Sequence, residues 1–161
     1  MQLDKVLCID YDLDLSNLVF EETRKLKNDH WHMTMFDWTP LIDDVCPVLE
    51  QWSLDMYDLT LKLMNDGKYL NTKNYKSSVM KYTDGYINEH TDRGMLSFIY
   101  NKIDNLEVFY DNNWVTMDKD KLIIFYGDLG PYPMKHRRKK ANGISLNFFA
   151  SPDDIEYPWT L

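Results

Sequence analysis

Two histidines and an aspartate in the second half of the chain have the residue types and spacing of a metal site. His90 and Asp92 are two positions apart in "HTDRGMLSFIY", and His136 follows 46 positions after His90. In an extended chain, residues two apart leave the same face, so an imidazole and a carboxylate could reach one ion. His136 is the only histidine further along, so it is the candidate third ligand. Two histidines and one carboxylate, with coordination positions left open, are typical of iron(II) sites that bind dioxygen.

A second pair of histidines offers a rival set of ligands. His30 and His32 lie in "DHWHMTMFDW" and would share one face of a strand. No carboxylate follows at a matching spacing, and the neighbours Trp31 and Met33 are residue types common in cores. We therefore favour a structural or substrate-lining role for this pair and keep it as the alternative set of ligands.

Short β-like runs separated by turn residues fill the chain from Ser78 onward. "LEVFYDNNWV" predicts a hairpin, because Asp111, Asn112 and Asn113 tolerate left-handed backbone. Several short strands at near-regular spacing predict an antiparallel sandwich or barrel, in which a strand paired nearby could supply the third ligand. The predicted strands are SVMKY, LSFIY, LEVFY, WVTM, KLIIFYG and ISLNFFA.

The first half of the chain is predicted to be mainly helical. A short strand is expected over residues 5–9, a helix over 16–28, and a second helix over 46–66, with Pro47 in its first turn and Gly67 at its end. Apolar residues of the second helix recur at steps of three and four and form one packing face. These residues are Leu49, Trp52, Met56, Leu59 and Leu63.

Length and composition indicate one domain with a core of its own. The chain has 161 residues, of which 44% are hydrophobic and 14% aromatic. We predict a mostly β domain with N-terminal helices (α+β). Residues 1–77 would form a helical brace with a short N-terminal strand, and residues 78–161 would form the iron-binding β region.

Charge and cysteine content narrow the classes of partner. The net charge is −8, and residues 1–66 carry 14 acids against 5 bases, which argues against a nucleic-acid-binding surface. Cys8 and Cys46 are the two cysteines, and they fit reduced thiols better than a disulfide framework. No apolar run approaches the roughly 18 residues of a membrane span. We expect a cytoplasmic protein that binds neither membranes nor nucleic acid.

The order of motifs in the second half resembles a known family. The stretches are "YTDGYINEHTDRGMLSFIY", "NLEVFYDNNWVTMDKDKLIIFYGD" and, after "HRR", "GISLNFFASPDD". Over residues 78–158 the chain resembles the C-terminal half of the isopenicillin-N-synthase-like family of Fe(II)/2-oxoglutarate-dependent oxygenases. The resemblance implies a double-stranded β-helix, or jelly roll, with iron in its open mouth. It also implies that His90, Asp92 and His136 are the iron ligands.

The resemblance further implies a 2-oxoglutarate site beside the iron. Tyr82 and Ser145 match the residues that hydrogen-bond a carboxylate of the cosubstrate. Where the family has an arginine two residues before that serine, this chain has Gly143. An arginine–carboxylate pair is bidentate and charge-assisted, so its loss should weaken 2-oxoglutarate binding unless another cation replaces it.

Two cations are candidates to replace that arginine. Lys139 alternates with Gly143 along a strand, so it could reach the cosubstrate, although we favour a solvated lysine. Arg93 directly follows Asp92, and neighbours on a strand point to opposite faces, so it is expected to point away.

We therefore expect a mononuclear Fe(II) oxygenase that uses 2-oxoglutarate and dioxygen to oxidise a small-molecule or peptide substrate. One alternative is an Fe(II) oxidase without 2-oxoglutarate, in which the substrate itself binds iron as in isopenicillin N synthase. Gly143 favours this alternative. The other alternative is a non-catalytic binding protein on the same fold.

Overall fold

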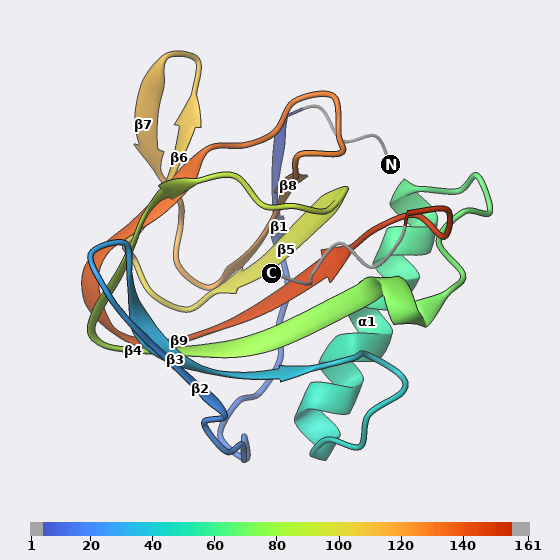
Figure 1. Ribbon diagram of the computed structural model, residues 1–161, viewed down its shortest axis with the longest axis horizontal. Coiled ribbons are helices and arrows are strands. Elements are labelled where there is room, and N and C mark those ends of the chain that lie inside the picture. The colour runs from blue at the N-terminus through green and yellow to red at the C-terminus, as the bar shows by residue number, and fades with distance from the viewer. Residues whose placement is uncertain (1–4, 156–161) are drawn as a thin grey trace.

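A computed structural model of the chain describes residues 5–155, which form one curved antiparallel sheet and one long helix (Figure 1). Across the sheet the strands follow the order β1–β8–β5–β9–β4–β3–β2, and β6 and β7 form a hairpin beside β9. The elements in chain order are β1 (Val6–Asp10), β2 (Arg24–Lys27), β3 (Trp31–Trp38), α1 (Pro47–Leu63), the 3-10 turn η1 (Thr72–Asn74), β4 (Tyr75–His90), β5 (Leu96–Asn101), β6 (Leu106–Tyr110), β7 (Asn113–Thr116), β8 (Lys121–Tyr126) and β9 (His136–Ala150).

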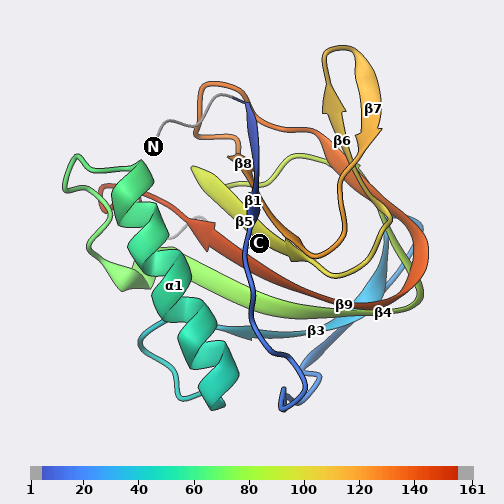
Figure 2. The ribbon, with the colours of Figure 1, turned by 180° about the vertical axis from the view of Figure 1, so that it is seen from behind.

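Two long central strands, β4 and β9, give the sheet its curl. They pair from Tyr75 opposite Ala150 to His90 opposite His136. The last residues of β9 also pair with β5, whereas its first residues pair with β6. Two successive strands therefore share one edge of β9, and the sheet wraps into a double-stranded β-helix (Figure 2). This confirms the predicted jelly roll.

Helix α1 packs on one face of the sheet, and the opposite face lines a cavity. Trp52 Nε1 donates to Ser77 Oγ at 3.0 Å, and Trp38 Nε1 donates to Ser53 Oγ at 2.9 Å, so hydrogen bonds fix the helix against β4 and β3. The helix predicted over 46–66 is confirmed, and the first three residues of its predicted apolar face are fully buried. No helix in the described part of the chain is long and apolar enough to cross a membrane.

The helix predicted over residues 16–28 is wrong. The last residues of this stretch form β2, which pairs with β3 and alternates between half-buried and exposed positions. Asn28 closes the hairpin, because its side-chain oxygen accepts the backbone N–H groups of His30 and Trp31 at 2.8 and 2.9 Å. The turn at Asn28 and the pairing with β3 outweigh the local helix propensity of this stretch.

Residues 1–77 are therefore not a helical brace apart from the β region. Strand β1 pairs with β8, and β3 pairs with both β2 and β4, so strands from the first half form both ends of the shared sheet. The hairpin predicted around Asp111–Asn113 is confirmed as β6–β7, since Asp111 and Asn112 adopt φ angles of 53° and 63°. Figure 1 shows this hairpin projecting from one end of the sheet.

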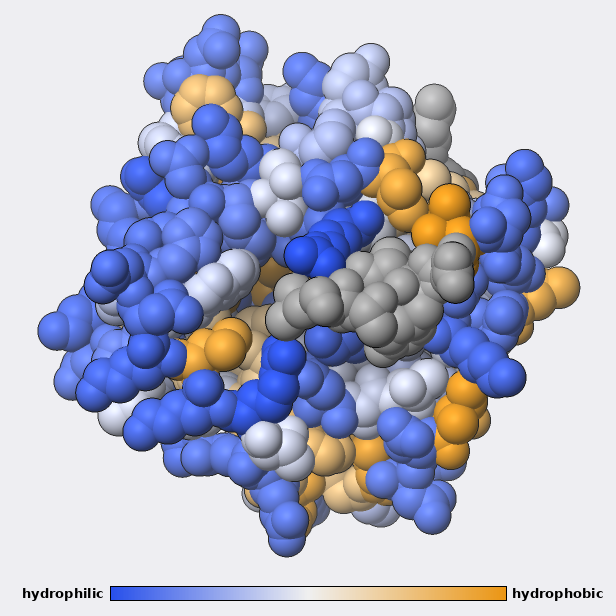
Figure 3. Space-filling model, viewed as in Figure 1, coloured by the Kyte–Doolittle hydropathy of each residue, from blue (hydrophilic) through white to orange (hydrophobic). Residues whose placement is uncertain are grey.

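The molecular face seen in Figure 1 is mostly hydrophilic. Apolar residues gather there in small, separate groups rather than in one broad patch (Figure 3).

Candidate metal centre

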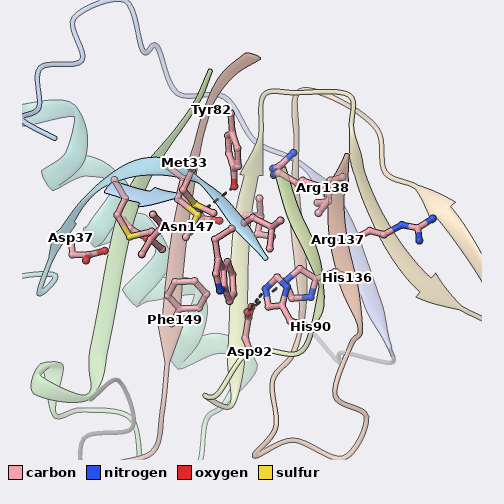
Figure 4. A pocket seen from close by; sticks show the side chains of 18 of the residues that line it. Met33, Asp37, Tyr82, His90, Asp92, His136, Arg137, Arg138, Asn147 and Phe149 are labelled. Carbon is pink, nitrogen blue, oxygen red and sulfur yellow. Dashed lines mark hydrogen bonds and ion pairs between the residues drawn. The ribbon is translucent and has the colours of Figure 1, made fainter. Parts of the chain in front are cut away.

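The three candidate metal ligands lie together on the cavity side of the sheet (Figure 4). Asp92 Oδ1 lies 3.4 Å from His90 Nε2 and 3.5 Å from His136 Nε2. His90 ends β4 and His136 begins β9, where the two are paired in register, and Asp92 lies in the bend that leads to β5. Within residues 5–155 this is the only group of His, Cys, Asp or Glu side chains that could hold a metal ion.

Backbone carbonyls fix the orientation of both imidazoles. His90 Nδ1 lies 2.9 Å from the carbonyl oxygen of Asn88, and His136 Nδ1 lies 2.9 Å from that of Met134. Because a carbonyl can only accept, each Nδ1 carries the proton and each Nε2 presents its lone pair toward Asp92. This arrangement is typical of histidines that bind a metal.

Asp92 carries the negative charge of the group. Ser97 Oγ donates to its Oδ2 at 2.6 Å, which leaves Oδ1 facing the histidines. Burial opposes ionisation, but electrostatic attraction to His136 and His90 outweighs it and holds the pKa of Asp92 far below its usual range. Burial likewise opposes the charged form of His90, but Asp92 raises the pKa of that imidazole. An ionised carboxylate between two imidazoles favours a cation, so the donor set fits Fe(II).

A cavity of about 600 Å³ extends from these three side chains over β9, β4 and β3. Trp31 lines it beside the centre, with its ring centroid 5.0 Å from that of His90. Polar groups lie on two sides of the cavity: Figure 4 shows Tyr82 and Arg138 on one side and Asp37 on another.

Tyr82 and Ser145, the residues expected to bind the cosubstrate, are adjacent at the first of these polar sides. Both are buried, with 2% and 0% exposure. Burial raises the pKa of Tyr82, although hydrogen bonds with Ser145 and Arg138 oppose the rise. Asn147 Nδ2 also donates to Ser145 Oγ at 3.1 Å, so β4 and β9 together provide a row of buried hydrogen-bonding groups.

Position 143 has no room for the arginine of the family pattern. Gly143 has a φ of 138°, which disfavours any side chain. A Cβ atom there would lie 2.9 Å from Cγ1 of Ile103. The space that a side chain at 143 would need is therefore filled by Ile103.

An arginine is nevertheless present at this polar side, at a position that the sequence pattern did not single out. Arg138 is 4% exposed, and its guanidinium donates to Asn105 Oδ1 at 2.7 Å and Asn101 Oδ1 at 3.1 Å. Its Cζ lies 5.5 Å from the centre of the Tyr82 ring. Burial lowers the pKa of Arg138, and its hydrogen-bond partners among the described residues include no carboxylate. A buried cation with neutral partners is costly, which makes this a natural site for an anion.

A β-bulge turns Arg138 toward the cavity. Arg138 lies opposite Ile87 and Ala141 lies opposite Gly85, so Lys139 and Lys140 on β9 face the single residue Tyr86 on β4. Both lysines are exposed, and the residues on either side of them face inward. The extra residue reverses the alternation, so the even positions face the cavity before the bulge and the odd positions face it afterwards.

The other candidate cations lie elsewhere. Lys139 is outside this cavity: its side chain is 66% exposed and its Nζ lies 3.6 Å from Glu107. Arg93 lines the cavity, so the expectation that it points away is wrong. The bend over residues 91–95 is not a strand there, and strand alternation does not apply.

The rival histidines are not part of the metal cluster. His32 packs against Tyr86, with ring centroids 5.8 Å apart, and His30 packs against Trp31 at 4.9 Å. Trp31 in turn contacts His90. His30 therefore packs behind a residue that lines the cavity, whereas His32 packs against Tyr86 outside it.

The fold, but no family, connects this chain to known proteins. No family model matches the sequence, and no curated protein sequence matches it. Among solved structures, a prolyl-4-hydroxylase from Pseudomonas putida is 14% identical and has a TM-score of 0.60, over 76% of this chain and 73% of that one. A full-length Neurospora crassa protein, solved in complex with alpha-KG, is 11% identical and has a TM-score of 0.62. That match covers 80% of this chain and 61% of the Neurospora protein, so the chain spans about three fifths of that neighbour.

A third neighbour extends over more of the chain. A dioxygenase for auxin oxidation from Arabidopsis thaliana, solved with 2-oxoglutarate, is 16% identical, with a TM-score of 0.53 over 91% of this chain and 72% of that one. A further similar structure, from Caulobacter crescentus, is assigned to the 2OG-Fe(II) oxygenase family; it is 18% identical, with a TM-score of 0.53 over 96% of this chain and 66% of that one. At these identities the likeness shows that the double-stranded β-helix is shared, and the function has to be argued from the site.

Proposed function

We propose that the protein is a mononuclear Fe(II) oxygenase that uses 2-oxoglutarate as cosubstrate. The observation that carries the proposal is a pre-oriented His90–Asp92–His136 cluster beside a buried arginine that has no acidic partner among the described residues. The first feature suits a metal that keeps open coordination positions, and the second suits a dicarboxylate. Among these oxygenases, membership of the isopenicillin-N-synthase-like branch rests on the sequence resemblance.

The three side chains would hold the metal through His90 Nε2, His136 Nε2 and Asp92 Oδ1. Bound Fe(II), together with 2-oxoglutarate, would supply the activation of dioxygen for oxidation of a C–H bond, with decarboxylation of the cosubstrate. The chain's own contribution is orientation: carbonyls hold both imidazoles, and Ser97 holds the carboxylate. Removal of these outer contacts would weaken metal binding without removing a ligand.

Arg138 would bind the distal carboxylate of 2-oxoglutarate in place of the arginine missing at Gly143. Asn101 and Asn105 accept two of its N–H groups, and a guanidinium has five, so donors remain for a carboxylate. Tyr82 and Ser145 add hydroxyl groups at the same side of the cavity. Arg138 is two residues from His136 along β9, so one short strand segment would contribute to both binding sites.

Arg138 also bears on the alternative of an Fe(II) oxidase without 2-oxoglutarate. Gly143 favours that alternative only if no other cation is available for the cosubstrate. A buried, positively charged group beside the metal cluster favours an acidic cosubstrate instead. The substrate would be a small molecule or a peptide; one neighbour, a prolyl hydroxylase from Trichoplax adhaerens, was solved with a fragment of hypoxia inducible factor.

Anaerobic titration with Fe(II), followed by 2-oxoglutarate, tests the proposal. We expect iron to bind and 2-oxoglutarate to produce a visible metal-to-ligand charge-transfer band. His90→Ala should abolish both, whereas His32→Ala, in the rival pair, should leave both intact. Iron binding without the band would favour the oxidase alternative. Iron binding that survives His90→Ala would refute the proposed centre.

A further inference from the structure

A second polar region of the cavity lies where β2, β3 and β4 meet, away from Arg138. Arg24, Asp37 and Lys76 line it. Arg24 Nε lies 3.0 Å and Lys76 Nζ 3.9 Å from Asp37 Oδ2. These contacts hold two cations side by side at the wall of the cavity.

This region lies within reach of the metal cluster. Lys76 is opposite Phe149 of β9, and Phe149 is opposite Ser97 of β5, the residue that orients Asp92. Paired strands are about 4.8 Å apart, so Lys76 is roughly 10 Å from the strand that holds Ser97. A small molecule held at Lys76 could therefore extend to the metal.

Positive charge exceeds negative charge in this region. Besides Asp92, Asp37 is the only acid among the described residues that line the cavity, whereas Arg24, Lys76 and Arg93 also line it. Burial lowers the pKa of Lys76, Asp37 opposes this effect, and the two arginines reinforce it. A further negative charge would relieve the repulsion among these cations.

Besides Arg24 Nε, whose contact with Asp37 is an ion pair, two buried polar atoms here have no hydrogen-bond partner among the described residues. Ser78 is 1% exposed and lines the cavity, and its Oγ is one of the two atoms. The other is Oδ1 of Asp37, a residue directly across the sheet from Ser78. Buried polar groups are normally hydrogen-bonded, so both atoms point to a ligand with its own polar groups.

The surface between this region and the metal cluster is apolar. Figure 4 shows Phe149 and Met33 facing the cavity between Asp37 and Asp92. Met35 and Met80 also line this part, and methionine packs well against irregular apolar shapes. A cavity with an apolar floor and a few polar groups is the usual form of a small-molecule site.

We propose that the substrate is a small organic anion whose carboxylate or phosphate group is bound by Arg24 and Lys76. Its apolar body lies on Met33 and Phe149 and points toward the metal cluster. Ser78 donates a hydrogen bond to the anionic group, and Asp37 Oδ1 accepts one from a donor on the ligand. The assignment of this ligand as a substrate rests on the proposed oxygenase function, but its binding does not.

Calorimetric titration with three probes of similar size tests the proposal: 3-phenylpropanoate, phenyl phosphate and the neutral 3-phenylpropanamide. The protein is anaerobic, loaded with Fe(II) and saturated with 2-oxoglutarate, so that Arg138 is occupied. We expect one or both anions to bind at least about tenfold more tightly than the amide, as charge-assisted hydrogen bonds imply. A preference between the two anions would identify the group as carboxylate or phosphate.

Variants locate the anion. Lys76→Met and Arg24→Gln should each remove the preference for anions, whereas Lys62→Met, at an exposed lysine of α1, should not. The charge-transfer band of 2-oxoglutarate should persist in both cavity variants. Equal affinities for anions and amide, no binding of any probe, or a preference that survives both variants would overturn the proposal.

The titration also separates failure of the inference from failure of the proposed function. If wild-type protein shows no charge-transfer band, the oxygenase proposal fails, and the same probes are titrated into metal-free protein. Anion binding that depends on Lys76 but not on Arg138 would then still support the anion site. An anion preference lost in Arg138→Met but kept in Lys76→Met would refute it.

Discussion

The two halves of β9 line the same cavity with opposite alternation. In the first half His136 and Arg138 line the cavity, whereas in the second half Asn147 and Phe149 line it and Ser145 is buried beside Asn147. The bulge at Lys139–Lys140 separates the halves. The first half would thus supply a metal ligand and a cation, and the second half hydroxyl, amide and apolar surface. A one-residue irregularity decides which chemistry reaches the cavity.

Deletion of Lys140 should have the largest effect, because it would restore strict alternation between the halves. If the second half keeps its register with β4, His136 and Arg138 turn to the outer face. We expect loss of Fe(II) and of 2-oxoglutarate binding in calorimetry, beyond the roughly 10- to 100-fold cost of losing an outer contact. Lys140→Ala keeps the length of the bulge and should bind both like the wild type.

The deletion is informative only in a folded variant, which cooperative thermal unfolding and circular dichroism would verify. A folded deletion variant that binds Fe(II) with wild-type affinity would show that the bulge does not control the direction of His136.

The same bulge explains what could be predicted from the sequence and what could not. His90 and Asp92 could be predicted because their spacing is local. His136 could be predicted because the chain has no other histidine after His90. The arginine was missed because alternation counted back from Ser145 selects Lys139 and skips Arg138. A bulge depends on pairing with a distant strand, and neither Lys139 nor Lys140 carries a turn signal.

The wrong helix prediction near the N-terminus has a related cause. A helix was expected over residues 16–28, but Arg24–Lys27 pair with β3 as a strand. Local helix propensity carries no information about a pairing strand. The Asn28 turn that makes the hairpin, in contrast, is a local feature of the sequence. Helix α1 was predicted well because its apolar face and its Pro47 start are local features.

Arg138→Met tests the difference between the inward-facing Arg138 and the exposed Lys139 and Lys140 that follow it on β9. We expect 2-oxoglutarate affinity to fall about 10- to 100-fold, because a charge-assisted pair is lost. Lys139→Met, one residue further on, should leave that affinity unchanged. Titration of the charge-transfer band measures both, and an equal loss in the two variants would contradict the inward placement of Arg138.

Arg138→Met should also separate ligand binding from stability. Without ligand the guanidinium is a buried charge with neutral partners, so its removal should leave the melting temperature unchanged or raise it. The increase in melting temperature on adding 2-oxoglutarate should shrink in this variant. A large loss of ligand-free stability would instead indicate that Arg138 is mainly structural.

Ser97→Ala tests an outer contact of the metal cluster, on the strand that pairs with the second half of β9. Ser97 is on β5, opposite Phe149 of β9, and its hydroxyl group orients Asp92. Because the histidine contacts of Asp92 remain, we expect Fe(II) affinity to fall by about tenfold, the lower end for an outer contact. Calorimetry measures the change, and Ser78→Ala, a buried serine of β4 on the same cavity, is the matched control.

Gly143→Ala should have the smallest effect on the metal site, because it changes only the second half of β9, beyond the bulge. The new Cβ would meet Ile103 at 2.9 Å on a backbone with φ of 138°, so we expect a loss of about 1 to 3 kcal/mol in urea denaturation. Gly67→Ala, also at positive φ but with no atom of the described chain within 4 Å, should cost less, because only backbone strain acts there. Adding Ile103→Val to Gly143→Ala should recover part of the loss if the contact is its cause. Fe(II) affinity should stay at the wild-type value throughout, because His136 and its carbonyl contact lie on the far side of the bulge.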